Sequence, residues 1–209
     1  MRRIISAVLA LGLLAAIAYS GAKLWALDEE IKAEQSLHIE LLRQKPAPIP
    51  KDQDNPLARL RKKNPDIIGW ITVPYTNIDY PIVQAKDNSY YLHRDLNGAY
   101  AKPGTIFMDY RCAGDGSGYS ILYGHNMKSG AMFGTLGRFG DKAFLDAHPG
   151  GRILFEDGWH TIDFTAFMTV RENDGEIYAV PQGSERAVAL STCSYAYQGA
   201  RMVLLGRVR

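Results

Sequence analysis

An uncharged apolar run near the N-terminus places the strongest constraint on this chain. Met1-Arg2-Arg3 precedes a stretch from Ile4 to Ala22 without a charged residue, and acidic residues follow from Asp28. A helix of this length comes close to spanning the hydrocarbon core of a bilayer. The positive charges before it predict a cytoplasmic N-terminus and an extracellular body. The alternative is a cleaved signal peptide, since Ala16-Ile17-Ala18 resembles a cleavage site, but the run is long for one.

The rest of the chain divides at a cluster of prolines. We assign residues 1–27 to a signal-anchor or transmembrane segment. Residues 28–55 predict a polar stalk helix to about residue 45 and then a stiff linker, because Pro46, Pro48 and Pro50 cannot continue a helix. Residues 56–209 form the predicted folded domain, which opens with a short helix.

Beyond Ile67 the pattern changes to short apolar runs separated by turn residues. These runs predict eight strands, at about 67–73, 78–84, 104–109, 119–124, 152–156, 159–170, 186–193 and 201–208. Residues 87–93 and 131–147 predict short helices or irregular crossovers. Short strands at this spacing favour a closed or nearly closed barrel. The predicted fold is mainly β: an eight-stranded barrel with N-terminal helices and short crossover helices, preceded by one transmembrane helix.

Charge and histidine spacing exclude two classes of function. The net charge is only +2, and the basic residues are scattered apart from a short helical face near residue 60, so we expect no nucleic-acid partner. No HExxH motif is present, and no two histidines stand at metal-ligand spacing. We therefore expect neither a metal site nor another cofactor.

Cys193 stands where one apolar strand ends, and Arg201 stands where the next begins. If these strands pair in an antiparallel manner, the two Cβ atoms lie roughly 5 Å apart. The guanidinium would then favour the thiolate and donate to an oxyanion. His125 follows another strand in a glycine-containing turn, where a base can face a cleft. From the residues alone, a core histidine, a solvated arginine and a Cys112–Cys193 disulfide stay open as alternatives.

Three segments, taken in order, resemble the sortases, the membrane-anchored cysteine transpeptidases of Gram-positive bacteria. They are Tyr123-Gly124-His125-Asn126-Met127, Leu190-Ser191-Thr192-Cys193-Ser194-Tyr195 and Ala200-Arg201-Met202-Val203. Residues 64–71, 78–84, 87–92 and 104–109 are similar to class B sortases in particular. The resemblance covers about residues 56–209 and assigns them to a sortase catalytic domain.

The resemblance implies a role for each residue of the site. Cys193 would be the nucleophile, His125 the general acid or base, and Arg201 the cation that positions the substrate and stabilises the oxyanion. Four further residues are implied to bind substrate: Asn88, Leu92, Tyr123 and Ser191. A disulfide at Cys193 would be incompatible with this role. Cys112 matches no motif of the family.

The resemblance also implies a reaction and its partners. A secreted protein with a C-terminal sorting signal would acylate Cys193, and the Thr carbonyl would pass to an amine. That amine would belong to a peptidoglycan precursor or to a pilin, and the lack of a second apolar segment near the C-terminus favours wall anchoring. The segment between His125 and Cys193 is shorter than is usual in class B sortases. Two alternatives remain: a cysteine peptidase, and a membrane-tethered binding module stapled by Cys112–Cys193.

Overall fold

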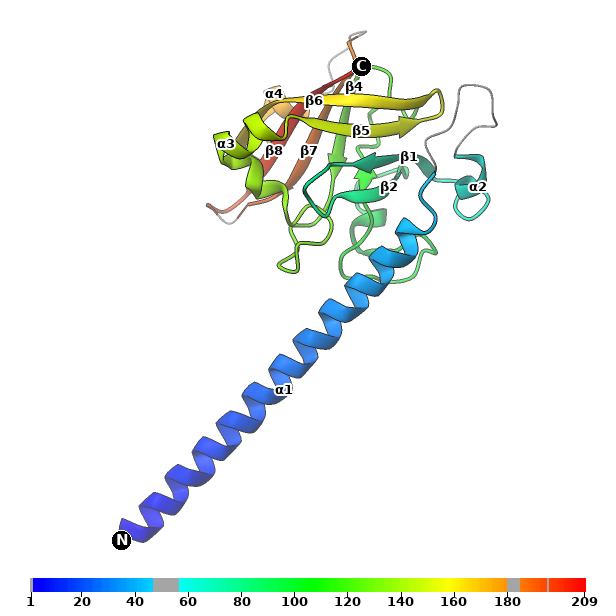
Figure 1. Ribbon diagram of the computed structural model, residues 1–209. Coiled ribbons are helices and arrows are strands. Elements are labelled where there is room, and N and C mark those ends of the chain that lie inside the picture. The colour runs from blue at the N-terminus through cyan, green and yellow to red at the C-terminus, as the bar shows by residue number, and fades with distance from the viewer. Residues whose placement is uncertain (1, 47–56, 180–184, 195) are drawn as a thin grey trace. The chain divides into compact units, whose positions relative to one another are not determined.

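A closed β-barrel forms the body of the protein. The computed structural model describes residues 2–46, 57–179, 185–194 and 196–209. Within these residues, eight strands close in the order β1-β2-β3-β4-β7-β8-β6-β5 (Figure 1). They are β1 (Ile67–Thr72), β2 (Asp79–Val83), β3 (Phe107–Met108), β4 (Tyr119–Tyr123), β5 (Gly150–Phe155), β6 (Gly158–Arg171), β7 (Ala187–Cys193) and β8 (Ala200–Val208). The predicted eight-stranded barrel is confirmed, although β3 is only two residues long.

The predicted membrane segment and the predicted stalk helix form a single helix. One continuous helix, α1 (Arg2–Leu42), joins the apolar run to the polar stalk. It has no break at the predicted boundary after residue 27, because no proline or glycine lies between Ala22 and Leu42. From Ile5 onward, α1 is long and apolar enough to cross a membrane. The predicted linker beyond residue 46 lies outside the described residues.

Short helices lie before β1 and in the connections between strands. They are α2 (Ala58–Arg61), the 3-10 helices η1 (Tyr90–His93) and η2 (Leu136–Gly140), α3 (Lys142–Ala147) and α4 (Gly175–Tyr178). Asp141 caps α3 by accepting a hydrogen bond from the Ala143 amide, and Asp174 caps α4 in the same way from Glu176 and Ile177. The chain divides into two compact units, Met1–Leu37 and His38–Arg209.

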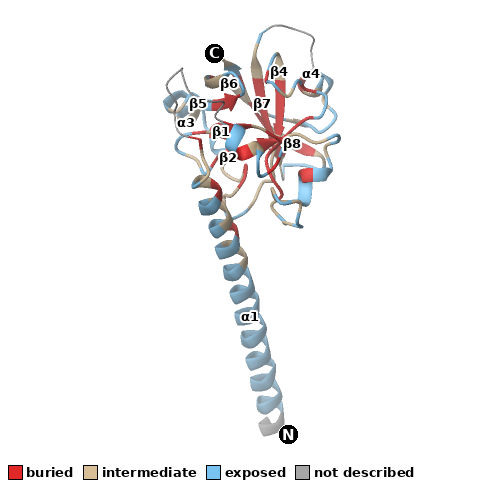
Figure 2. Cartoon of the chain, turned by 90° about the vertical axis from the view of Figure 1, so that its right-hand side faces the viewer, coloured by how far each residue is buried: buried red, intermediate tan, exposed pale blue. Residues whose placement is uncertain are grey.

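The barrel core is aromatic and aliphatic. Figure 2 shows the buried residues concentrated on the strands, and Trp70, Phe133 and Phe155 are among the largest fully buried side chains. Each contributes roughly 1.5–3 kcal/mol by leaving water. Gly69 allows β1 to approach β5, because a Cβ at this position would lie 2.4 Å from the Leu154 carbonyl oxygen.

The two neighbours of β7 decide which residues meet at its C-terminal end. β4 is parallel to β7, with Tyr123 opposite Ser191. β8 is antiparallel to β7, with Arg201 opposite Cys193. The end of β4, the end of β7 and the start of β8 therefore lie together at one end of the barrel.

Candidate active site

The antiparallel pairing of β7 and β8 brings the arginine to the thiol. Cys193 and Arg201 are direct cross-strand partners, as the sequence predicts. Arg201 Nη1 donates a hydrogen bond to Cys193 Sγ over 2.6 Å. The guanidinium of Arg201 thus lies directly against the sulfur atom of Cys193.

The parallel pairing of β4 and β7 places the histidine beside the cysteine. The register that sets Tyr123 opposite Ser191 sets His125 opposite Cys193 when it is extended by two residues. The Gly124 amide donates to the Ser191 carbonyl over 3.3 Å, which continues the ladder. Asn126, which the sequence analysis left without a role, donates from Nδ2 to the Cys193 carbonyl over 2.9 Å. These bonds hold the two strand ends in register.

The surroundings of His125 define its tautomer and its charge. His125 Nε2 lies 2.8 Å from the Leu92 carbonyl oxygen, which can only accept, so Nε2 carries the proton of the neutral ring. Nδ1 is then the nitrogen that can take up a proton. The ring of His93 stacks on that of His125 at 5.1 Å. Burial lowers the pKa of His125, the Leu92 carbonyl opposes this, and the nearby charges of His93 and Arg201 lower it further.

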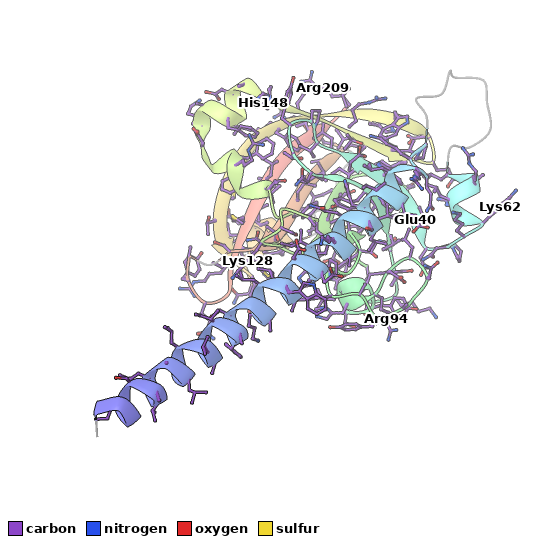
Figure 3. All side chains as sticks on the ribbon, turned by 60° about the horizontal axis from the view of Figure 1, so that its bottom comes forward. Glu40, Lys62, Arg94, Lys128, His148 and Arg209 are labelled. Carbon is purple, nitrogen blue, oxygen red and sulfur yellow. The ribbon has the colours of Figure 1, made fainter. Side chains whose placement is uncertain are left out.

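A cavity of about 300 Å³ joins these groups to the predicted substrate-binding residues. All seven residues singled out in the sequence line it: Asn88, Leu92, Tyr123, His125, Ser191, Cys193 and Arg201. Figure 3 labels Arg94 and Lys128, exposed residues on two loops that follow Leu92 and His125 in sequence. Leu92 itself is 38% exposed, so its side chain is accessible.

One wall of the cavity is fixed by a carboxylate that the sequence analysis did not single out. Asp109 is fully buried, and its Oδ2 accepts from Asn88 Nδ2 and from the Tyr123 hydroxyl, each over 3.0 Å. Arg111 also donates to this carboxylate, from Nε to Oδ1 and from Nη2 to Oδ2, each over 2.8 Å. Burial alone would raise the pKa of Asp109, but the hydrogen bonds outweigh burial and lower that pKa to about 2. The same carboxylate therefore orients two residues of the cavity.

The connection between β6 and β7 supplies two further cavity residues. Glu172 Oε2 accepts a hydrogen bond from Arg201 Nη2 over 3.1 Å. Tyr178, the last residue of α4, shares a hydrogen bond of 2.9 Å between its hydroxyl and Ser191 Oγ. Burial raises the pKa of Tyr178, so this hydroxyl stays protonated near neutral pH. No motif in the sequence indicated either residue, because both lie in a connection rather than in a patterned strand.

Both cysteines are free thiols. The predicted alternative of a Cys112–Cys193 staple is therefore wrong, and Cys193 is available for chemistry. Cys112 is buried, and burial raises its pKa, which makes it a poor nucleophile. Among the described residues, no group of three or more His, Cys, Asp and Glu side chains could hold a metal ion.

Comparison with known proteins agrees with this geometry. Residues 71–208 match the sortase domain family. The chain is 37% identical over 182 residues to sortase B of Listeria monocytogenes, an alignment that covers 73% of each protein. The fold matches sortase B of Bacillus anthracis with a TM-score of 0.72 and 28% identity, over 86% of this chain and 98% of that one. It also matches a class B sortase of Streptococcus pyogenes involved in pilus biogenesis, with a TM-score of 0.64 and 28% identity, over 73% and 97%.

The chain belongs to the sortase family, and its relatives are class B. Sortases are cysteine transpeptidases, so the protein is an enzyme of that type.

Proposed function

We propose that this enzyme cleaves a C-terminal sorting signal of secreted proteins and transfers the Thr carbonyl to an amine of peptidoglycan. The observation that carries the proposal is the hydrogen bond of 2.6 Å from Arg201 Nη1 to Cys193 Sγ, at a cavity that His125 also lines. A thiol, an imidazole and a guanidinium that face one cavity meet the requirements for acyl transfer through a thioester.

Acylation uses each of the three side chains. The Cys193 thiolate attacks the carbonyl carbon of the scissile peptide bond, and the charge that develops on oxygen is stabilised by the Arg201 guanidinium. His125, protonated at Nδ1, gives its proton to the leaving amide nitrogen. The peptide bond breaks, the C-terminal fragment leaves, and a thioester on Cys193 remains.

Deacylation reverses these roles. An amine attacks the thioester carbonyl, His125 takes up a proton, and the Cys193 thiolate leaves. The donor peptide would occupy the cavity that Asn88, Leu92, Tyr123 and Ser191 line. Asp109 supports the proposal because it holds Asn88 and Tyr123 in place.

We place the enzyme in the cell membrane as a single-pass protein. The apolar part of α1 supplies the span. The basic residues that precede it put the N-terminus in the cytoplasm, and residues 56–209, as the catalytic domain, on the outer side. This location gives the cavity access both to exported proteins and to the growing wall.

A second candidate acceptor is a pilin amine. The Streptococcus pyogenes relative is a class B sortase involved in pilus biogenesis, so the class B fold does not by itself restrict the acceptor to the wall. The chemistry at Cys193 would be the same for both acceptors, and only the amine would differ.

The test is a cleavage screen with the full chain in detergent. A peptide library is offered with and without an added amine, and mass spectrometry detects the acyl-enzyme and the amide product. Cys193→Ala should abolish both species, whereas Cys112→Ala, the matched control, should retain them. Activity in Cys193→Ala would refute the assignment. A cysteine peptidase would give only the acid product, whether or not an amine is present.

A further inference from the structure

Glu172 is the only carboxylate that lines the catalytic cavity in the described part of the chain. It follows the end of β6, and its amide donates to the Gly199 carbonyl over 2.9 Å, which fixes its backbone to the loop between β7 and β8. Its side chain is 59% exposed, so it lies where solutes can reach it.

The guanidinium of Arg201 bridges the Glu172 carboxylate and the sulfur of Cys193. Arg201 donates from Nη2 to Glu172 Oε2 over 3.1 Å and from Nη1 to Cys193 Sγ over 2.6 Å. Within the described residues, Glu172 Oε1 accepts no hydrogen bond from the protein. One carboxylate oxygen therefore orients the arginine, and within the described residues the other is left available to a ligand in the cavity.

We propose that Glu172 binds the ammonium group of the acceptor next to the thioester, an inference that rests on the proposed transfer reaction. A primary amine of the α-amino or lysine type has a pKa of roughly 8 or above, so it enters the site mainly as a cation near neutral pH. Arg201 would repel that cation. Cys193 carries the acyl group at this step and so has no charge. The remaining ionisable groups that line the cavity are His125, Tyr123 and Tyr178, and none of them is an anion near neutral pH because burial raises the pKa of both tyrosines. Glu172 alone supplies a negative partner there.

The transfer step balances without any further reagent. The bound ammonium gives one proton to water, and its lone pair then attacks the thioester carbonyl carbon. The C–N bond forms, the C–S bond breaks, and the electron pair of that bond leaves with sulfur. A second proton passes from nitrogen through His125 to the Cys193 thiolate. The products are an amide, a thiol and one released proton.

The experiment compares a charged with an uncharged nucleophile on the same acyl-enzyme. The full chain in detergent is acylated by a peptide obtained from the cleavage screen. The acceptor is Nα-acetyl-lysine amide, which is cationic at about pH 7, or hydroxylamine, which is mainly neutral there. Glu172→Gln is informative because the amide oxygen can still accept from Arg201 while the charge is lost. Glu176→Gln is the matched control, an exposed glutamate of α4 that does not line the cavity.

We expect the ratio of kcat/KM for the lysine amine to that for hydroxylamine to fall roughly fivefold in Glu172→Gln, the upper end of the range for a partly exposed charge pair. The ratio should stay at the wild-type value in Glu176→Gln. Added salt should lower the wild-type ratio toward that of Glu172→Gln, because it screens the attraction.

Two results would overturn the proposal. An unchanged ratio in Glu172→Gln, with acyl-enzyme still formed, would remove the ammonium site and leave the transpeptidase assignment intact. An equal fall for both nucleophiles would mean that Glu172 acts only by positioning Arg201. By contrast, a wild-type chain that forms no acyl-enzyme would refute the proposed function itself, and the ammonium site with it.

Discussion

Two arginine–carboxylate pairs are built in opposite ways: Glu172 and Arg201 line the cavity, whereas Asp109 and Arg111 lie behind the lining residues Asn88 and Tyr123. Asp109 is fully buried and receives two hydrogen bonds from the side chain of Arg111 together with those from Asn88 and Tyr123. The carboxylate of the other pair, Glu172, is 59% exposed and receives one bond from Arg201. Among the described residues, Asp109 therefore has several hydrogen-bond donors around it, whereas the Glu172 side chain has only Arg201.

The difference shows that burial decides what an arginine–carboxylate pair can do. A buried carboxylate must be surrounded by donors, because an unpaired charge away from water costs several kcal/mol. Asp109 is therefore committed to holding the wall of the cavity. The exposed pair is worth at most about 1 kcal/mol, so Arg201 can turn toward sulfur or an oxyanion at little cost. The Asp109–Arg111 pair holds the cavity wall in place, and the Glu172–Arg201 pair takes part in the reaction.

The largest effect is expected when each arginine is replaced by lysine, and the two replacements should affect different properties. Arg201→Lys keeps the charge but loses the planar fork that reaches Cys193 and Glu172 together. We expect kcat/KM to fall on the order of a hundredfold, as for loss of an oxyanion donor, with less than about 1 kcal/mol lost in stability. Arg111→Lys should show the reverse, with a loss of about 2 kcal/mol in the free energy of unfolding. Peptide cleavage assays measure kcat/KM, and urea denaturation measures the free energy of unfolding. Similar changes of both quantities in the two variants would contradict the proposed difference between the pairs.

The second prediction compares the two carboxylates. Asp109→Asn keeps the shape but removes the acceptor charge that faces Arg111, Asn88 and Tyr123. We expect a loss of about 2 kcal/mol in the free energy of unfolding, less than for a wholly buried pair because Arg111 is partly exposed. KM for the donor peptide should rise as well. Glu172→Gln should change stability by less than about 0.5 kcal/mol. Equal losses in the free energy of unfolding for the two variants would contradict this prediction.

The third prediction concerns acid. The pKa of Asp109 is about 2 in the folded protein and 3.8 as an ordinary aspartate. A depressed pKa means that the unfolded chain binds the proton more readily. The stability that Asp109 contributes is complete above its ordinary pKa and is lost as pH falls through about 4 toward 2. Urea denaturation over this range should show a steeper decline in the wild type than in Asp109→Asn. Parallel pH profiles would rule out this linkage.

The smallest expected effect concerns His125. Burial lowers its pKa, and the charges of His93 and Arg201 add to this. The ring should thus be neutral near pH 7, with its NMR titration midpoint below about 6.5. Because the folded state binds this proton less readily than the unfolded chain, protonation should weaken folding as pH falls below that value. His93→Gln should raise the midpoint, since one repelling charge is removed. A midpoint above that of an ordinary histidine would show that burial does not dominate.

Periodic patterns allowed much of the fold to be predicted. All eight strands were identified from alternating apolar runs and turn residues, and the pairing of Cys193 with Arg201 followed from two strands joined by a short loop. When a short loop joins two strands, the loop fixes their register, so the register can be predicted from the sequence. Cys193, His125 and Arg201 could be named because they stand at strand ends within motifs of the family.

Other features depend on contacts between distant segments. Asp109 and Glu172 carry no local signal, because their links to the cavity come from distant residues: Asn88 and Tyr123 donate to Asp109, and Arg201 donates to Glu172. The parallel pairing of β4 with β7 is likewise a property of barrel closure, since long connections separate the two strands. The sequence by itself determined the strands, the apolar helix and the identity of the reactive groups. The tertiary structure decided which charges are buried and which stay open, because burial depends on the packing of the whole barrel.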